Sequence, residues 1–226
     1  MPREEAEPVG SGVKSSPFPG CLILVTIIVV FGGLLVLYTV VGNYQQKQIA
    51  GFTEEVAAEI EVPNPSPEEA EAAQDKLDQI SASVSEGIPD RITFTAADLN
   101  ALIANRPELE DFRGQTFIEG ITPKGIVARM SQPMRKGFLD KSFRYLNATF
   151  VLEPELRART IAFKVVEIQP DVGEIPRQFV DSYAVLDFFR LDPEIPAIEE
   201  SIASIAAVYS EAEIIVVETK IPSEDK

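Results

Sequence analysis

The sequence predicts an α+β protein held to a membrane by a single N-terminal helix. Residues 21–41 form an uncharged apolar run, and residues 116–168 alternate apolar and polar side chains with the period of antiparallel strands. Helix-capping patterns lie on the N-terminal side of the alternating stretch. The 226 residues suffice for one ordinary domain with additional segments. We therefore expect one transmembrane helix, a helical stalk and an antiparallel β-meander packed with helices.

The expected membrane anchor is the run from Cys21 to Val41, 21 residues without a charged side chain. A helix of this length reaches about 30 Å, the thickness of the hydrocarbon layer of a bilayer. A cleaved signal peptide is the alternative, because Val40 and Gly42 are small, although such peptides have shorter apolar runs and a basic start. The residues that we expect to form the anchor are Cys21, Phe31, Gly32, Gly33, Tyr38 and Val41.

The basic residues around the apolar run set the expected orientation. Arg3 and Lys14 precede the run, and only Lys47 follows it closely. Basic residues near a spanning helix favour the cytoplasmic side. We therefore expect residues 1–20 to be a disordered cytoplasmic tail of a single-pass protein of the cell membrane, with the C-terminal domain outside the cytoplasm.

Residues 42–87 are expected to form an acidic helical stalk. Apolar residues first recur every three or four positions, which is typical of a short amphipathic helix: Ile49, Phe52, Val56 and Ile60. A proline-rich stretch over 62–67 interrupts this pattern. Ser66 and Glu69 then form a capping box, which predicts a second helix that ends at Gly87. Its apolar seam is too short for a coiled coil, so we expect it to pack on the chain's own domain.

Residues 88–226 are expected to fold as the extracytoplasmic α+β domain. Thr95 and Asp98 form a second capping box, and the pair Val165-Val166 breaks the alternation of its strand as a β-bulge would. The last strand is expected inside the sheet, because consecutive β-branched residues favour cover on both faces. The expected strands are 91–94, 116–121, 126–131, 142–152, 157–168 and 212–219, and the expected helices start at 95, 176 and near 196.

The distribution of charge excludes one class of partner and indicates a candidate basic patch. The chain carries 20 basic and 36 acidic residues, so we expect no binding of nucleic acid. Residues 124–164 nevertheless hold nine basic and three acidic residues. They form either an ordinary solvated surface or a basic face that meets the acidic flanks of the chain, an anionic lipid or an anionic polymer. The candidate patch consists of Arg129, Arg135, Lys136, Lys141 and Arg144.

The composition also removes most catalytic chemistry. The chain has no histidine and one cysteine, which excludes serine–histidine and cysteine–histidine catalysis and the usual zinc sites. The carboxylates of Glu153 and Glu155 are expected at a solvated strand end. We expect no catalytic residue, no metal and no cofactor, and hence no enzyme.

Several short motifs resemble the YpmS-like group of single-pass envelope proteins of unknown function. They are Leu99-Asn100, Ser131-Gln132-Pro133, Tyr145-Leu146-Asn147 and Gly173-Glu174-Ile175-Pro176. The resemblance implies half of a tubular lipid-binding (TULIP-like) fold, in which a curled antiparallel sheet wraps a helix and leaves a groove for an acyl chain. The residues that we expect at such a groove or docking face are Leu99, Asn100, Ile103, Phe150, Phe163, Phe179 and Tyr183.

These observations together predict a membrane-anchored, non-catalytic binding module. Its expected partners are the lipid bilayer and either a bound lipid or an envelope protein. The alternative is a structural or accessory subunit of an envelope complex. The sequence leaves the oligomeric state open.

Overall fold

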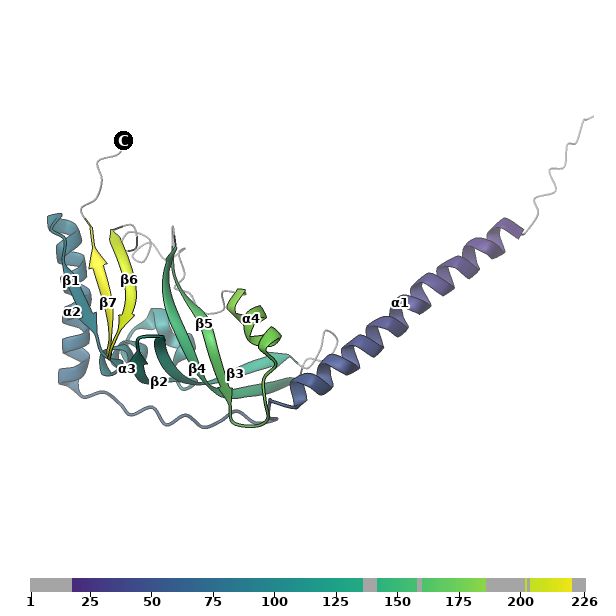
Figure 1. Ribbon diagram of the computed structural model, residues 1–226, viewed down its shortest axis with the longest axis horizontal. Helices are drawn as coiled ribbons and strands as arrows, with labels where there is room; N and C mark the ends of the chain where they lie inside the picture. The colour runs from purple at the N-terminus through teal and green to yellow at the C-terminus, as the bar shows by residue number, and fades with distance from the viewer. Residues whose placement is uncertain (1–17, 136–141, 158–159, 186–201, 203, 221–226) are drawn as a thin grey trace, which may run out of the picture. The chain divides into compact units, whose positions relative to one another are not determined.

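The computed structural model describes residues 18–135, 142–157, 160–185, 202 and 204–220, with side chains of the first helix from Val30 onward (Figure 1). The chain divides into two compact units, one that ends at Gln46 and one that begins at Lys47. Helix α1 (Phe18–Ala50) forms most of the described part of the first unit. Among the residues whose side chains the structure describes, which in α1 begin at Val30, no helix has an apolar stretch sufficient to traverse a bilayer.

The second unit contains a four-stranded antiparallel sheet, here called sheet A, which confirms the predicted meander. Its strands are adjacent in sequence order: β2 (Thr116–Thr122), β3 (Gly125–Arg135), β4 (Phe143–Arg157) and β5 (Thr160–Pro170). Val151 pairs with Glu167 and Leu152 with Val165, so Val166 has no partner on β4. The predicted bulge at Val165-Val166 is therefore confirmed.

A second, three-stranded sheet, here called sheet B, contains β1 (Arg91–Phe94), β6 (Ile205–Glu211) and β7 (Ile214–Thr219) in the order β1-β7-β6. The predicted strand at 91–94 is confirmed. The last strand is central, as expected, but it belongs to sheet B instead of the meander. The helical spacing of Ile198, Ile202, Ile205 and Tyr209 predicts that the helix expected to start near 196 continues through Tyr209. This continuation is wrong, because Ile205–Glu211 pair with β7 as β6. The β-branched residues at the centre of β7 favour a position between two strands. The pairing of β6 with β7 therefore outweighs the helical spacing of the apolar residues in β6.

The helices begin and end where their caps predict. In α2 (Pro67–Glu86) the Ser66 hydroxyl accepts from the Glu69 N–H and the Glu69 carboxylate accepts from the Ser66 N–H, while Gly87 ends the helix with a φ of 65°. Helix α3 (Ala96–Asn105) begins with the predicted box of Thr95 and Asp98. The 3-10 helix η1 (Pro107–Phe112) and α4 (Arg177–Val185) complete the described helices.

The stalk differs from the prediction. Helix α1 ends at Ala50, and no helix is formed over residues 51–66. The apolar spacing predicted that these residues share one buried face of a helix. They do not, because Phe52 is 2% exposed and Val56 is 74% exposed. Helix α2, by contrast, packs on the chain's own domain as expected, because Ala73 and Ile80 are buried there. The acidic segment thus runs along the domain to which it belongs.

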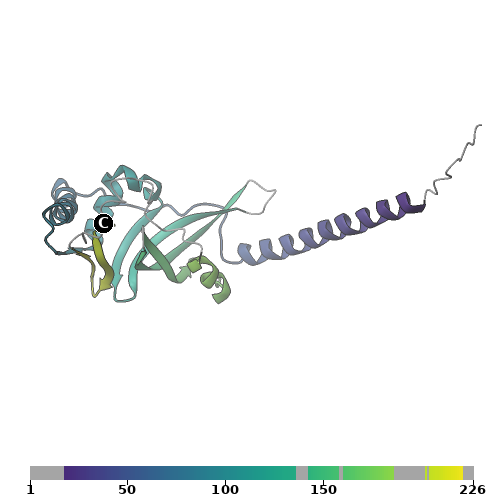
Figure 2. The same cartoon turned by 90° about the horizontal axis from the view of Figure 1, so that it is seen from above.

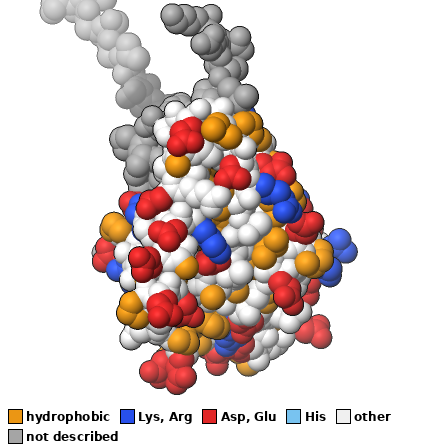
Figure 3. Space-filling view, turned by 90° about the vertical axis from the view of Figure 1, so that its left-hand side faces the viewer, with side chains coloured by type: hydrophobic (Ala, Val, Ile, Leu, Met, Phe, Trp, Pro, Cys, Tyr) orange, Lys and Arg blue, Asp and Glu red, His pale blue; other side chains and the backbone are white. Residues whose placement is uncertain are grey.

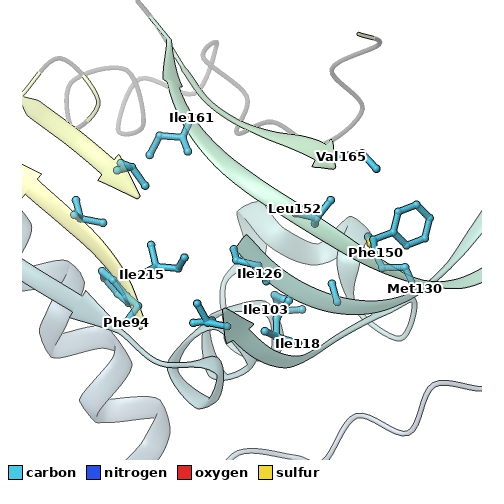
Figure 4. Packing of buried hydrophobic residues seen from close by; sticks show 14 of the residues in the cluster. Phe94, Ile103, Ile118, Ile126, Met130, Phe150, Leu152, Ile161, Val165 and Ile215 are labelled. Carbon is cyan, nitrogen blue, oxygen red and sulfur yellow. The ribbon is translucent and has the colours of Figure 1, made fainter. Parts of the chain in front are cut away.

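The core lies between sheet A, sheet B and α3 (Figure 4). Strands β3 and β4 supply its centre with Met130 and Phe150, which are at most 1% exposed. Ile103 of α3, Phe94 of β1 and Ile215 of β7 close it from the other side. Side chains from both sheets therefore share one packed interior.

Candidate functional site

Many hydrogen bonds outside the two sheets involve the segment that follows α1, residues 51–58, here called the junction segment. The Glu54 N–H donates to the Tyr145 carbonyl at 2.8 Å, and the Tyr145 N–H donates to the Glu54 carbonyl at 2.7 Å. Strand β5 pairs with β4 only as far as Ala148, whereas β4 begins at Phe143. The junction segment thus occupies the edge of β4 that β5 leaves open.

Asn147 of β4 fixes the junction segment with its side-chain amide. Its Nδ2 donates to a Glu54 carboxylate oxygen at 2.6 Å and to the Val56 carbonyl at 3.1 Å. Its Oδ1 accepts from the Ala58 N–H at 2.9 Å and from the Ser131 hydroxyl at 2.7 Å. Both donors and both acceptor positions of the amide are used, and the residue is 3% exposed. Asn147 is therefore a structural hub and not a free ligand-binding group.

Apolar packing holds the other end of the junction segment. The Phe52 ring lies edge-on to the Phe179 ring of α4, with 4.9 Å between centroids. Position 173, in the turn before α4, requires glycine for two reasons. The φ of Gly173 is +70°, and a Cβ at this position would lie 2.0 Å from the Gly51 carbonyl oxygen. The segment is thus packed between β4, this turn and α4.

Arg144, a member of the candidate basic patch, binds the junction segment. Its guanidinium donates to the Thr53 hydroxyl at 2.8 Å and the Thr53 carbonyl at 2.5 Å, and it lies 3.3 Å from a Glu55 carboxylate oxygen. Arg129 forms an ion pair with Asp171. Acidic groups of the same chain therefore pair with both of these members of the candidate patch.

The other members of the candidate patch differ in how they are placed. Arg135 is exposed at the end of β3. Lys136 and Lys141 lie outside the described residues. The sequence left open whether the basic residues form an ordinary solvated surface or meet the acidic flanks of the chain. Arg144 agrees with the second alternative, because its guanidinium lies beside the carboxylate of Glu55 in the acidic flank.

The candidate groove residues are mostly packing residues. Phe150 and Ile103 are buried in the core, whereas Leu99, Phe163 and Phe179 are half-buried against it. Tyr183 lies in α4, and its side chain is outside the described residues.

Asn100 is half-buried, and its side chain binds the backbone of a neighbouring strand. Its amide donates to the Ile118 carbonyl at 2.9 Å and accepts from the Ile118 N–H at 2.8 Å. The partner residue lies in the outer strand β2. These two bonds satisfy the N–H and the carbonyl of Ile118 on the open edge of sheet A.

A hollow of about 410 Å³ lies between the start of α3, β2 and the β6–β7 turn. Glu119 and Glu213 are its charged lining residues, so its chemistry suits a cationic or hydrogen-bond-donating group. The lining consists of Thr95, Ala96, Ala97, Glu119, Gly120, Ile121, Glu213 and Ile214. Among the residues that the structure describes, no group of three or more metal-ligating side chains is present.

Acidic side chains dominate the face of the domain that carries α2 (Figure 3). Lys76 is the basic residue of this helix, and it is turned to the buried carboxylate of Asp98 at 2.5 Å. The exposed acids of α2 are Glu68, Glu69, Glu71, Asp75, Asp78 and Glu86. A face of this charge repels other anionic groups.

The carboxyl group of Asp98 combines burial with several hydrogen bonds. Burial alone raises its pKa, but the hydrogen bond from Lys76 and the two from Thr95 together outweigh burial, and the pKa lies below its ordinary value of 3.8. A lowered pKa means that the folded domain prefers the ionised carboxylate more strongly than the unfolded chain does.

Replacing Asp98 by asparagine is therefore expected to destabilise the domain at neutral pH, with a difference that shrinks in acid. The contribution of the carboxylate is present above its ordinary pKa of 3.8 and is lost as the pH falls through the lowered pKa of the folded state. Denaturation curves of both proteins from neutral pH to below that value measure the effect. Glu69→Gln is the control, because the lowered pKa of Glu69 arises at an exposed cap. A difference that does not change with pH would contradict the assignment.

The predicted anchor residues lie on α1. Gly32 and Gly33 have open space around them, and Phe31, Tyr38 and Val41 are exposed. Cys21 lies on the same helix, with its side chain outside the described residues. The exposed large apolar residues of α1 are Val30, Phe31, Leu34, Leu35, Val36, Leu37, Tyr38, Val40, Val41 and Tyr44. Five of them are consecutive and cover more than one full turn, so every side of the helix is apolar there.

Sequence reasoning missed the junction segment, although it singled out several residues around it. Ser131, Tyr145, Asn147 and Gly173, quoted above for the family resemblance, all contact this segment or support a residue that does. None of the known protein-family models, curated proteins or solved structures matches the chain. The resemblance to YpmS-like proteins thus stays a prediction, and function is argued from the geometry.

Proposed function

We propose that this protein is a membrane-anchored, non-catalytic module whose α+β domain docks another envelope component outside the cytoplasmic membrane. The observation that carries the proposal is the shell of exposed apolar side chains around α1. Water does not favour a helix that is apolar on all sides, whereas lipid does. The uncharged run 21–41 has the length that a bilayer requires.

The junction segment supports a role in positioning. The chain passes from the last turn of α1 into hydrogen bonds with β4, and the Thr53 hydroxyl donates to the Ile49 carbonyl at 2.7 Å. This contact, the pairing of Glu54 with Tyr145 and the four bonds of Asn147 leave little freedom between Ile49 and Ala58. A domain attached in this way is held close to the bilayer, which raises its effective concentration for a membrane partner.

The placement of the candidate groove residues favours docking over lipid carriage. A groove for an acyl chain would need apolar side chains that face an open space. Phe150 and Ile103 instead fill the core, and Asn100 is used by β2. These contacts support the accessory-subunit alternative over a lipid carrier.

Alkaline carbonate extraction of membranes that contain the full chain tests the anchor. We expect the protein to stay in the membrane pellet and the double variant Leu34→Lys, Leu37→Lys to move to the supernatant. Each lysine near the centre of a spanning helix costs about 3 kcal/mol. Ile88→Lys, Val172→Lys is the matched control, because both residues are exposed apolar residues of the domain. Release of the unmodified chain with its first forty residues intact, or a mature N-terminus after the apolar run, would overturn the proposal.

Cross-linking in intact membranes tests docking. A protein partner in fixed ratio is the expected result. A chain that purifies with bound lipid and cross-links to no protein would overturn the docking role and leave the anchor in place.

A further inference from the structure

Strands β3 and β4 extend beyond their neighbours as a two-stranded ribbon (Figure 2). The pairing of β2 with β3 reaches Met130, and the pairing of β5 with β4 stops at Ala148. The β3–β4 pairing continues to Arg135 and Phe143. An isolated ribbon is only marginally stable in water, and here the junction segment supports it through Arg144 and Tyr145.

The end of this ribbon presents an exposed cation beside an exposed aromatic ring. Arg135 and Phe143 are directly opposite each other, and Phe143 is 44% exposed. Arg129 and Arg144 each have an acidic partner, whereas Arg135 has no ion-pair partner among the described residues. A charged group next to a large exposed apolar group matches the interface between water and lipid.

The ribbon end is attached to the chain close to the expected membrane surface. Arg144, next to Phe143, donates to Thr53, three residues after α1 ends at Ala50. From Val41 to Ala50 the helix rises about 14 Å, and three further residues add at most about 10 Å. The ribbon is thus bonded to the chain within about 25 Å of contour from the end of the apolar run, so headgroups lie within its reach.

We propose that Arg135 and Phe143 form a second membrane contact, which binds anionic lipid headgroups of the bilayer that holds α1. This inference rests on the proposed anchoring of α1. The guanidinium of Arg135 pairs with headgroup phosphate in a bidentate manner, and the Phe143 ring enters the interfacial layer. The chain has a net charge of −16, so most of its surface is repelled by anionic lipid. An exposed arginine at this place therefore determines which part of the domain faces the membrane.

The absence of tryptophan from the sequence allows a specific test. Phe143→Trp introduces a single indole at the ribbon end, and Ile88→Trp introduces one at another exposed apolar position as the control. Both full-length variants are reconstituted into vesicles of phosphatidylcholine, with and without phosphatidylglycerol, that contain brominated lipid. We expect blue-shifted emission and strong quenching for the indole at 143 in anionic vesicles and solvent-like emission for the indole at 88.

Adding Arg135→Gln to the Phe143→Trp chain is expected to weaken the membrane contact about fivefold in anionic vesicles, the effect of one basic residue near such a surface. Quenching at 143 no greater than at 88, in a chain that the vesicles retain, would overturn the second contact and leave the anchor intact. Quenching that responds neither to Arg135→Gln nor to phosphatidylglycerol would overturn the role of the headgroup charge. Loss of the whole chain from the vesicles would overturn the proposed anchoring as well.

Discussion

Replacing Phe52 by alanine is expected to lower the free energy of unfolding of the domain by about 4 kcal/mol. Phe52 is 2% exposed, so the substitution removes a buried ring and leaves a cavity between the junction segment and α4. Chemical denaturation of the full chain in detergent micelles measures the difference. We expect a lower midpoint with little change of slope, because both proteins expose nearly the same surface when they unfold.

Two further variants separate the packing of Phe52 from a general loss of apolar surface. Phe143→Ala is the matched control and is expected to cost less than about 1 kcal/mol, because that ring is exposed. A double-mutant cycle with Phe179→Ala is expected to give a coupling of about 1 kcal/mol, typical of an edge-to-face pair. If Phe52→Ala were no more harmful than Phe143→Ala, the junction segment would not be a packed part of the domain.

The parts of the fold that the sequence predicted correctly depend on neighbouring residues. The capping boxes at Ser66 and Thr95 each join residues three apart, and the expected strands 116–121 and 126–131 follow each other after a short connection. The bulge at Val166 breaks a local alternation. The interactions behind these patterns are formed between residues that are close in sequence. They can therefore be predicted without knowing the tertiary contacts.

The incorrect predictions concern segments whose structure is decided by distant residues. Phe52 and Val56 have helical spacing, but the pairing of Glu54 with Tyr145, 91 positions away, fixes them in a non-helical conformation. Tyr209 likewise follows a helical pattern and lies in a strand because β7 needs a partner. Contacts of this kind outweigh local preference, which differs by only a few tenths of a kcal/mol per residue between most residue types.

The candidate site shows the same division. Counts of basic residues identified Arg129 and Arg144, yet the sequence could not reveal that Asp171 and Glu55 neutralise them. The exposed position of Arg135 likewise follows from the length of the β3–β4 pairing. Charge composition thus predicts that basic groups are present, and tertiary structure decides which of them remain free to bind a partner.

Asn147→Ala is expected to cost about 3 kcal/mol, because it removes a side chain that is 3% exposed together with four hydrogen bonds. The Glu54 carboxylate, the Val56 carbonyl, the Ala58 N–H and the Ser131 hydroxyl each lose one hydrogen bond. The cost therefore exceeds that of removing a single exposed amide. The matched control is Asn105→Ala, an exposed asparagine whose side chain donates to the Ala101 carbonyl, with an expected change within about 0.5 kcal/mol.

Hydrogen exchange distinguishes release of the junction segment from a loss of stability of the whole domain. In Asn147→Ala the Glu54 and Tyr145 amides are expected to exchange much faster, since their mutual bonds no longer have the support of the Asn147 side chain. The amides that join β3 to β4 around Ala128 and Phe150 are expected to change only by the global difference in stability. If all these amides changed by the same factor, Asn147 would stabilise the domain as a whole. The junction segment would then unfold only together with the whole domain, and the connection between the anchor and the domain would not open locally.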